Sequence, residues 1–367
     1  MKVLYSLDSL NRGGAETQAL DVIQNAKAFG IETIVVATGG GGLEENFRQS
    51  GVEFIRLQRK KPVDLNIVKD LRKIIKKHNV QIVQGYQPVE GIHLYLATLG
   101  LPVKRILSFQ GFISDQKNRL TSKFLIPKMD ANIVVSNGLK KWLQSVDKLK
   151  TDKSFKLIYN GADPKRLLPS GKCLKKELGL NEKTRLFGMI ANFYRDPRKD
   201  QITLCHALPK IFANVENAHC VFVGRMEEGA ENKLNECLEI CKQHNLSERV
   251  HFLGERTDIP DILASLDVFV FSSLHEGLPV AASEAMLAGV PLVISDIEPL
   301  LEVSKNGEYA EIFRVRNADQ LSDKVVKLLK NNDFRENLRS RALQYAKNNF
   351  SIDAHLNRLT HLYDTLL

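Results

Sequence analysis

Short runs of β-branched and aliphatic residues alternate with longer amphipathic stretches along the whole chain. This alternation is typical of βαβ units, in which parallel strands form one sheet and helices cover both of its faces. In the first half, the pattern predicts strands at residues 3–6, 33–37, 54–57, 82–84, 105–109, 131–135 and 156–159. In the second half, it predicts strands at residues 186–190, 219–223, 250–252, 268–271, 291–294 and 311–315.

The pattern restarts after a turn-rich stretch at residues 160–171, which we interpret as a hinge. Because 367 residues exceed the roughly 250–300 that one core usually holds, two domains are expected. We predict two Rossmann-type α/β domains, at residues 1–164 and 165–350, with helices at 318–330, 334–348 and 351–366. Ligands of such sheets bind at the carboxyl ends of the strands, so two facing domains imply a cleft between them.

Composition excludes several classes of protein. Hydrophobic residues at 43% and charged residues at 26% are ordinary values for a globular chain, so disorder is not expected. The five cysteines lie in the second half without CxxC spacing, which argues against a disulfide framework or a zinc site, and no metal is expected. Neither a signal peptide nor a long apolar run is present, and we therefore expect a cytoplasmic protein.

The positive charge is concentrated in the first half. Residues 1–165 carry 26 Lys and Arg against 15 Asp and Glu, a balance that suits nucleic acid, anionic lipid or an anionic substrate. Residues 111–128 mix basic residues such as Lys117 and Lys123 with apolar ones such as Leu120 and Phe124. A helix on a membrane surface has this composition, and so does a core-facing helix with a solvated basic side.

Gly13-Gly14-Ala15-Glu16 follows the first strand and opens the first predicted helix. Glycines at this point let a ligand approach the backbone, where the helix N-terminus favours an anion. The spacing is not that of GxGxxG, and a simple structural turn explains it equally well.

A second loop of this kind runs from Ser272 to Pro279, between a buried strand and a helix that we expect to begin with Pro279 at its first position. Backbone N–H groups at Gly277 and Leu278 would then point towards a diphosphate above the strand end. Glu276 lies in the loop and Glu284 about a turn and a half into the helix. Two carboxylates in one pocket suit the hydroxyl groups of sugars and riboses, although an isolated helix glutamate is more often solvated.

Together these segments resemble the family-4 retaining glycosyltransferases of the GT-B fold. The resemblance rests on Glu276-Gly277-Leu278-Pro279, on Glu284-Ala285-Met286 eight positions later, and on Ala288-Gly289-Val290-Pro291. It extends over nearly the whole chain through the Gly13–Glu16 turn, the linker at residues 160–163 and Gly224-Arg225. In this fold two Rossmann-like domains face each other, and the last helix, here residues 351–367, crosses back to the first domain.

The resemblance implies a role for each site residue. Glu276 would contact the donor sugar, Glu284 the ribose, and Lys199 the donor diphosphate, with Arg195 as a further catalytic cation. Other donor-binding positions would be Gly14, Arg198, Gly224, Arg225, Glu255, His275, Gly277, Leu278 and Pro279, and the acceptor-side positions would be Gly13, Glu16, Gln110 and Gly111.

Two positions depart from the family pattern. The arginine that usually precedes the diphosphate lysine aligns near Asn192 or Phe193, so Arg195 or Arg198 would have to replace it. The usual His-Gly of the first domain is Gln110-Gly111 here, so the contacts on the acceptor side are expected to differ from those of the family.

The resemblance implies transfer of a sugar from a nucleotide-sugar, with UDP as the expected nucleotide, without a metal or another cofactor. In other enzymes, a single preorganised group that stabilises developing charge contributes roughly 3–4 kcal/mol to transition-state stabilisation. The expected acceptor is a glycan or a lipid-linked intermediate of polysaccharide assembly at the cytoplasmic membrane face, and no nucleic acid is expected. Competing interpretations are another GT-B enzyme, such as a sugar-nucleotide epimerase or a phosphorylase, and a non-enzymatic basic protein that binds membranes or nucleic acid.

Overall fold

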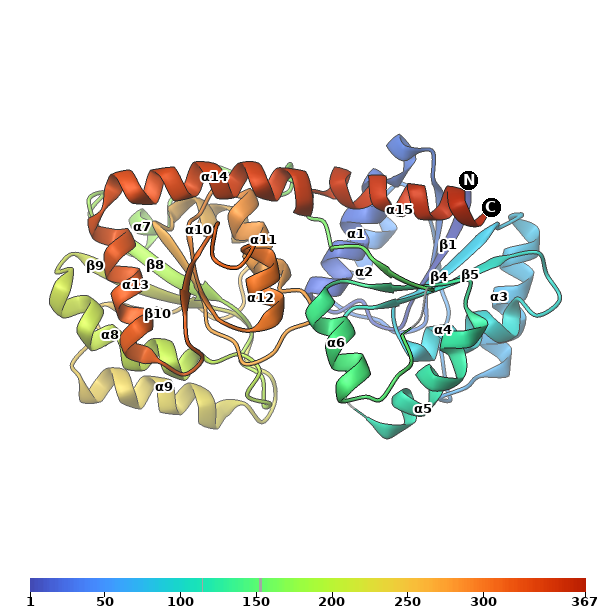
Figure 1. Cartoon of the computed structure of the whole chain (residues 1–367), viewed down its shortest axis with the longest axis horizontal. Helices are drawn as coiled ribbons and strands as arrows, with labels where there is room; N and C mark the ends of the chain where they lie inside the picture. The colour runs from blue at the N-terminus through green and yellow to red at the C-terminus, as the bar shows by residue number, and fades with distance from the viewer. Residues whose placement is uncertain (114, 152–153) are drawn as a thin grey trace. The chain divides into compact units, whose positions relative to one another are not determined.

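The computed structural model describes residues 1–113, 115–151 and 154–367. Ser114, within the basic stretch discussed above, lies outside the described residues. The chain divides into two compact units (Figure 1). Unit 1 comprises Met1–Ala162 together with Ile352–Leu367, and unit 2 comprises Asp163–Ser351. Each unit holds a parallel sheet with helices on its faces, so the predicted α/β fold class is confirmed.

Within its described residues, unit 1 holds a seven-stranded parallel sheet in the order β3-β2-β1-β4-β5-β6-β7. Its strands are β1 (Lys2–Leu7), β2 (Glu32–Ala37), β3 (Glu53–Arg56), β4 (Ile82–Gly85), β5 (Lys104–Phe109), β6 (Ala131–Val134) and β7 (Phe155–Leu157). Its helices are α1 (Gly14–Asn25), η1 (Ala26–Phe29), α2 (Glu44–Arg48), α3 (Leu65–Lys77), α4 (Pro88–Ala97), α5 (Gln116–Leu125), η2 (Ile126–Lys128), α6 (Asn137–Ser145) and α15 (Ile352–Leu366).

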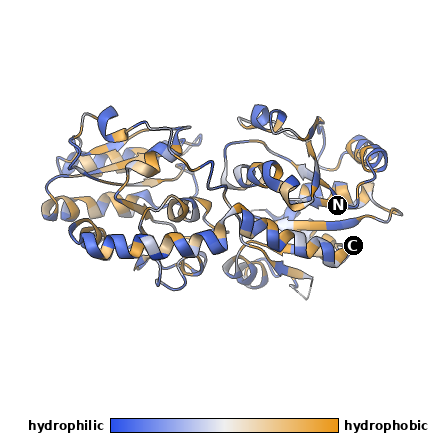
Figure 2. Cartoon of the chain, turned by 90° about the horizontal axis from the view of Figure 1, so that it is seen from above, coloured by the Kyte–Doolittle hydropathy of each residue, from blue (hydrophilic) through white to orange (hydrophobic). Residues whose placement is uncertain are grey.

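Alternate residues of the strands fill two cores in unit 1, because side chains along a strand point to opposite faces of the sheet. Val3 and Tyr5 of β1 pack with α1 and α15, whereas Leu4 packs with α3 and α4. The last helix thus completes a core that begins with the first strand, and both termini lie side by side in Figures 1 and 2. Tyr363 of α15 reaches into this core, where its hydroxyl group lies 2.9 Å from that of Tyr5.

Unit 2 repeats the arrangement with a six-stranded parallel sheet among the described residues, in the order β10-β9-β8-β11-β12-β13. Its strands are β8 (Arg185–Ile190), β9 (Ala218–Val223), β10 (Val250–Phe252), β11 (Val268–Phe271), β12 (Leu292–Ser295) and β13 (Glu311–Phe313). Its helices are α7 (Leu174–Glu177), α8 (Gln201–Asn214), α9 (Glu231–Gln243), α10 (Ile259–Ser265), α11 (Val280–Leu287), α12 (Glu298–Val303), α13 (Ala318–Lys330) and α14 (Asn332–Phe350).

The helices of both units mix hydrophobic and hydrophilic residues (Figure 2), as expected where one face packs on a sheet and the other meets solvent. In each sheet the strand order reverses between two central strands, β1 and β4 in unit 1 and β8 and β11 in unit 2. The carboxyl ends of these two strands are where open α/β sheets bind their ligands.

The thirteen predicted strands are all present, with small differences at their ends. The largest difference is at β7, where only Phe155 is buried and the last two residues are exposed, so the hydrophobic pattern there was weak. Pro279 also differs from the prediction, since it precedes α11 as the N-cap residue in place of occupying the first helical position.

Candidate functional site

Two loops meet at the point where the strand order of unit 2 reverses. The first follows β8 and leads to Lys199 and Asp200, and the second follows β11 and begins with Ser272 and Ser273. Lys199 and Ser273 form an antiparallel bridge, and the Asp200 N–H donates to the Ser272 carbonyl at 3.0 Å. The two loops are therefore held together by their backbones.

Lys199 and Glu276, predicted as the diphosphate lysine and the sugar carboxylate, are brought into contact by these loops. The Nζ atom of Lys199 lies 2.5 Å from Oε1 of Glu276, and the Ser273 hydroxyl group donates to the same oxygen at 2.5 Å. The two charged side chains are only 13% and 10% exposed. Lys199 also lies 4.3 Å from the ring centroid of Phe271, an arrangement that stabilises the ammonium group.

The helix after the second loop, α11, carries the other predicted carboxylate. Glu284 lies in its second turn with a side chain 12% exposed, and its Oε1 is 2.5 Å from the guanidinium of Arg166. Leu278 and Pro279 are buried at the helix start, and His275 is half-buried in the loop. Arg166 was not predicted, because it lies in the linker outside any motif.

The predicted arginines do not join this contact. Arg198 donates to the carboxylate of Asp196, and its guanidinium lies 5.1 Å from the Tyr194 ring centroid. Arg195 is exposed, and its backbone N–H donates to the carboxylate of Glu227.

A lysine that the sequence did not single out binds two backbone carbonyl groups of the Lys199 loop. Lys233 of α9 donates to the carbonyl of Asp196 at 2.8 Å and to that of Lys199 at 3.2 Å. Burial lowers the pKa of Lys233. It lies in the first turn of α9 and outside any motif, so the sequence gave no hint of this contact.

Gly224 stands immediately after β9, where a side chain would not fit. A Cβ atom there would lie 2.2 Å from the carbonyl oxygen of Ala191. Arg225 follows, with its N–H bonded to the Asn192 side chain at 2.9 Å. Gly224 also donates to the carbonyl of Gly254, which precedes the exposed Glu255, so these predicted residues lie near one another at the end of the sheet.

In unit 1, the Gly13-Gly14 turn opens α1 as predicted, with Gly13 as the N-cap residue. Gln110 is held by two side chains, since it donates to Ser108 at 2.8 Å and accepts from Asn160 at 2.9 Å. Gly111 is half-buried, and a Cβ atom added to it would meet no atom within 4 Å.

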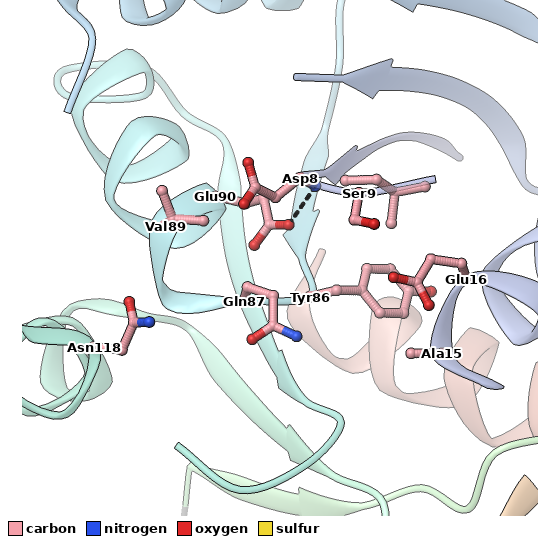
Figure 3. A pocket seen from close by; sticks show the side chains of 10 residues that line it. Asp8, Ser9, Ala15, Glu16, Tyr86, Gln87, Val89, Glu90 and Asn118 are labelled. Carbon is pink, nitrogen blue, oxygen red and sulfur yellow. Dashed lines mark hydrogen bonds between the residues drawn. The ribbon is translucent and has the colours of Figure 1, made fainter. Parts of the chain in front are cut away.

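Glu16 lines a pocket of about 250 Å³ where the strand order of unit 1 reverses (Figure 3). The pocket is bounded by the end of β1, by the residues that follow β1 and β4, and by the starts of α1, α4 and α5. The lining residues are Leu7, Asp8, Ser9, Ala15, Glu16, Tyr86, Gln87, Val89, Glu90 and Asn118. Of these, only Glu16 was predicted as a site residue.

Glu90 is the most deeply buried carboxyl group of this pocket, with an exposed fraction of 3%. Its Oε1 accepts from the Asp8 backbone N–H at 2.6 Å. Burial and the neighbouring Asp8 charge raise the pKa of Glu90 well above its usual value, and burial also raises the pKa of Glu16.

Two family models match the chain. The model of Glycosyl transferases group 1 matches residues 170–345, within unit 2, and the model of Glycosyltransferase Family 4 matches residues 12–166, nearly all within unit 1. The chain belongs to the family-4 glycosyltransferases. The resemblance inferred from the sequence motifs is therefore confirmed.

Curated relatives span most of this glycosyltransferase at moderate identity. It is 24% identical to N-acetyl-alpha-D-glucosaminyl L-malate synthase of Bacillus anthracis, over 83% of this chain and 80% of the relative. It is 25% identical to UDP-Gal:alpha-D-GlcNAc-diphosphoundecaprenol alpha-1,3-galactosyltransferase of Escherichia coli, over 82% of this chain and 81% of the relative.

Solved structures agree with the glycosyltransferase over its full length. Anabaena HepE in complex with UDP-glucose has a TM-score of 0.85 at 20% identity, covering all of both chains. WaaG, a glycosyltransferase involved in lipopolysaccharide biosynthesis, has a TM-score of 0.72 at 14% identity, covering 98% of this chain and 99% of the other. At these identities the likeness shows the GT-B fold alone.

Two further features of the glycosyltransferase concern its described residues only. None of their helices combines the length and the apolar character that a membrane crossing needs. No group of three or more His, Cys, Asp and Glu side chains gathers among them in a way that could hold a metal ion.

Proposed function

We propose that this glycosyltransferase moves a sugar from a UDP-sugar to a hydroxyl group of a lipid-linked glycan intermediate, with retention of the anomeric configuration. The observation that carries the proposal is the contact between Lys199 and Glu276 beside the start of α11. Support for UDP and for the lipid-linked acceptor comes from the Escherichia coli relative, whose name states both, and support for UDP comes also from Anabaena HepE, solved with UDP-glucose.

In this proposal Lys199 binds the donor diphosphate and Glu276 contacts the donor sugar. The buried ion pair fixes both side chains before the donor arrives, because neither charge is stable there without the other. The diphosphate then competes with Glu276 for the ammonium group, which frees the carboxylate for a sugar hydroxyl group.

The start of α11 supplies further donors for the phosphates. A helix N-terminus carries partial positive charge, and the loop residues Gly277 and Leu278 lead directly into α11. Lys199 and this helix would together stabilise the charge that develops on the leaving diphosphate, so the proposal requires no metal. Arg195 and Arg198 remain candidates for an additional cation.

Glu284 would hold the ribose hydroxyl groups. Its carboxylate is mostly buried, and its contact with Arg166 fixes its orientation. A hydrogen bond from a ribose hydroxyl group to a charged carboxylate contributes more to binding than one to a neutral group, roughly 1.5–3 kcal/mol.

The proposed donor reaction is tested by a thermal-shift panel of UDP-, GDP- and ADP-sugars with the full chain. A specific ligand at 100 times its dissociation constant adds about 2.7 kcal/mol of stability, so the true donor raises the melting temperature clearly. The anomeric configuration of the product, read from the proton coupling constant, then tests retention. An inverted product would reject the retaining mechanism, and stabilisation by GDP- or ADP-sugars alone would reject UDP.

Contact with an anionic membrane surface is the second part of the proposal. On α5, the apolar side chains of Leu120 and Phe124 are 59% and 46% exposed, and the exposed Lys117 and Lys123 belong to the same helix. Apolar and basic side chains exposed together suit insertion at the headgroup level of an anionic bilayer.

Liposome flotation tests the membrane contact. We expect flotation with vesicles containing phosphatidylglycerol, little with pure phosphatidylcholine, and a loss for the double variant Leu120→Ser, Phe124→Ser. Leu238→Ser, which changes a 44% exposed leucine on α9 of unit 2, serves as the matched control. Equal flotation of the double variant and the parent would remove this surface from the proposal.

A further inference from the structure

Three of the ten residues that line the pocket of unit 1 carry carboxyl groups. Asp8, Glu16 and Glu90 all line it, together with the polar side chains of Ser9, Gln87 and Asn118. Figure 3 shows Glu16 on one side of the pocket and the Asp8 and Glu90 carboxyl groups close together on another. Its volume of about 250 Å³ lies just below the roughly 300–1,000 Å³ of pockets for drug-sized ligands, and suits a group the size of one sugar ring.

One polar atom in this pocket is buried without a partner. Oε1 of Glu90 accepts the Asp8 N–H, but Oε2 has no hydrogen-bond partner among the described residues. Buried oxygens of this kind are rare, because a buried polar group that loses its water without gaining a hydrogen bond destabilises the fold. Since Glu90 lines the pocket, a ligand placed there can supply the missing hydrogen bond.

The charges of the pocket are less negative than a count of carboxyl groups suggests. Asp8 is paired with Arg59 at 2.7 Å and also accepts from the Thr38 hydroxyl group at 3.1 Å. Burial and the Asp8 charge favour the protonated form of Glu90, which then has one O–H to donate. Glu16 is the third carboxyl group of the pocket, and burial raises its pKa too.

This balance favours an uncharged ligand. An anion would meet the Asp8 and Glu16 carboxyl groups. These carboxyl groups already compensate the partial positive charge at the starts of α1 and α4, which would otherwise attract an anion. A cation would find Asp8 occupied by Arg59 and Glu90 held neutral. Hydroxyl groups, by contrast, both donate and accept, as the Glu90 carboxyl group and the Gln87 and Asn118 amides require.

We propose that this pocket binds an uncharged, hydroxyl-bearing sugar or polyol of the acceptor, with Glu90 and Glu16 recognising its hydroxyl groups. The assignment of this ligand as the acceptor rests on the proposed transferase function. Any phosphate of the acceptor must then lie outside the pocket. A dicarboxylate such as L-malate, named for the Bacillus anthracis relative, does not fit this chemistry.

Binding to the full chain, measured by saturation-transfer NMR titration in the presence of UDP, tests the pocket. The neutral probes are methyl α-glycosides of N-acetylglucosamine, galactose and mannose, the anionic probe is L-malate, and the cationic probe is methyl α-glucosaminide. We expect at least one neutral probe to bind at least tenfold more tightly than the other two classes. Preference for malate or for the amine would overturn the proposal.

Substitutions then assign the contact to Glu90. Glu90→Leu removes the polar group and is expected to weaken the neutral probe by about tenfold, whereas Glu90→Gln, which can still accept from Asp8 and donate, stays within about threefold. Glu16→Ala, at a half-buried position where folding is less affected, is expected to weaken it about fivefold. Glu32→Ala, 72% exposed on β2, is the control.

The outcomes separate this inference from the proposed function. Binding of UDP, measured by calorimetry, should be unchanged in all these variants. If UDP binds and the Glu90 and Glu16 variants keep parental affinity for the neutral probe, the pocket proposal is wrong and the transferase proposal stands. If neutral probes bind through Glu90 but no nucleotide-sugar stabilises the chain, the proposed function fails and the pocket assignment stands.

Discussion

The two units place their candidate sites at the same point of the same strand order, yet they line those points with different chemistry. In unit 2, Lys199 and Glu276 form an ion pair between the loops after β8 and β11. In unit 1, the loop after β1 contributes Asp8 and the first turn of α4, the helix that follows β4, contributes the buried Glu90. On the two proposals, the fold determines where each ligand binds, and the residues that line each point determine whether that ligand is charged.

The two sites also share a backbone device. A Cβ atom at Gly39, after β2, would lie 1.8 Å from the carbonyl oxygen of Asp8, just as one at Gly224, after β9, would lie 2.2 Å from that of Ala191. In each unit a glycine within two residues of the end of the second strand lets the chain pass close to the end of the first strand. This close backbone approach is a feature of the fold. The side chains beside it differ between the units, and in our proposals they suit different ligands.

The largest expected effect comes from removing the cation of unit 2. Lys199→Ala should lower kcat by roughly 10²–10³-fold, because a preorganised group that stabilises leaving-group charge contributes about 3–4 kcal/mol. Single-turnover rates with the donor found in the panel measure it.

The control for this variant is Lys210→Ala, which removes an exposed lysine paired with Asp323 in the same unit. Since Lys199→Ala also leaves Glu276 buried without its partner, the melting temperature of each variant must be recorded beside its rate. Turnover of Lys199→Ala within threefold of the parent would show that the ion pair has only a structural role.

The second-largest effect is expected at the two glycines that approach a backbone carbonyl group, Gly39 and Gly224. Gly39→Ala and Gly224→Ala should each lower the melting temperature by about 5–10 °C, since the added Cβ atom meets a backbone carbonyl and costs about 2–3 kcal/mol. Gly30→Ala in unit 1 and Gly179→Ala in unit 2 are matched controls, with positive φ but no atom within 4 Å, and should cost about 1 kcal/mol. Equal shifts for both pairs would mean that close approach is unimportant.

Much of this fold could be predicted from the sequence because buried parallel strands have near-continuous apolar runs. Val268–Phe271 and Leu292–Ser295 are examples, since all their residues are buried. Prediction was least accurate at β7, an edge strand in which only Phe155 is buried. Short helices such as α2 and α7 leave no pattern of their own in the sequence, because five or four residues are too few to show a helical period.

The site was predicted less evenly. The contact between Lys199 and Glu276 joins residues 77 positions apart, and only the resemblance to a known family indicated it. Glu90 was missed because a glutamate in the first turn of a helix is ordinarily a solvated residue that favours the helix dipole. The available clue was positional, since Asp8 and Glu90 follow the two strands between which the order reverses.

A smaller effect is expected at the helix of the unit 2 site. Glu284→Ala should weaken UDP binding by about tenfold to thirtyfold with little change in kcat, because its carboxylate is proposed to hold the ribose and not the reacting atoms. Isothermal titration calorimetry with UDP measures the affinity, and Glu236→Ala on α9 is an exposed control. Unchanged UDP affinity would remove the ribose role from Glu284 and leave its contact with Arg166 as structural.

The smallest expected effect concerns how unit 1 holds the last helix. Burial lowers the pKa of His355 in α15 to about 4, and its Nδ1 lies 2.7 Å from the Tyr159 carbonyl oxygen. A depressed pKa means that the unfolded chain takes up the proton first. The stabilisation is therefore complete above pH 6.5 and is lost as the pH falls towards 4, by about 1–2 kcal/mol between pH 7 and pH 5. Melting temperatures across this range should fall less steeply for His355→Gln than for the parent. Parallel curves would show that His355 does not contribute to acid sensitivity, and that another group controls how unit 1 loses stability.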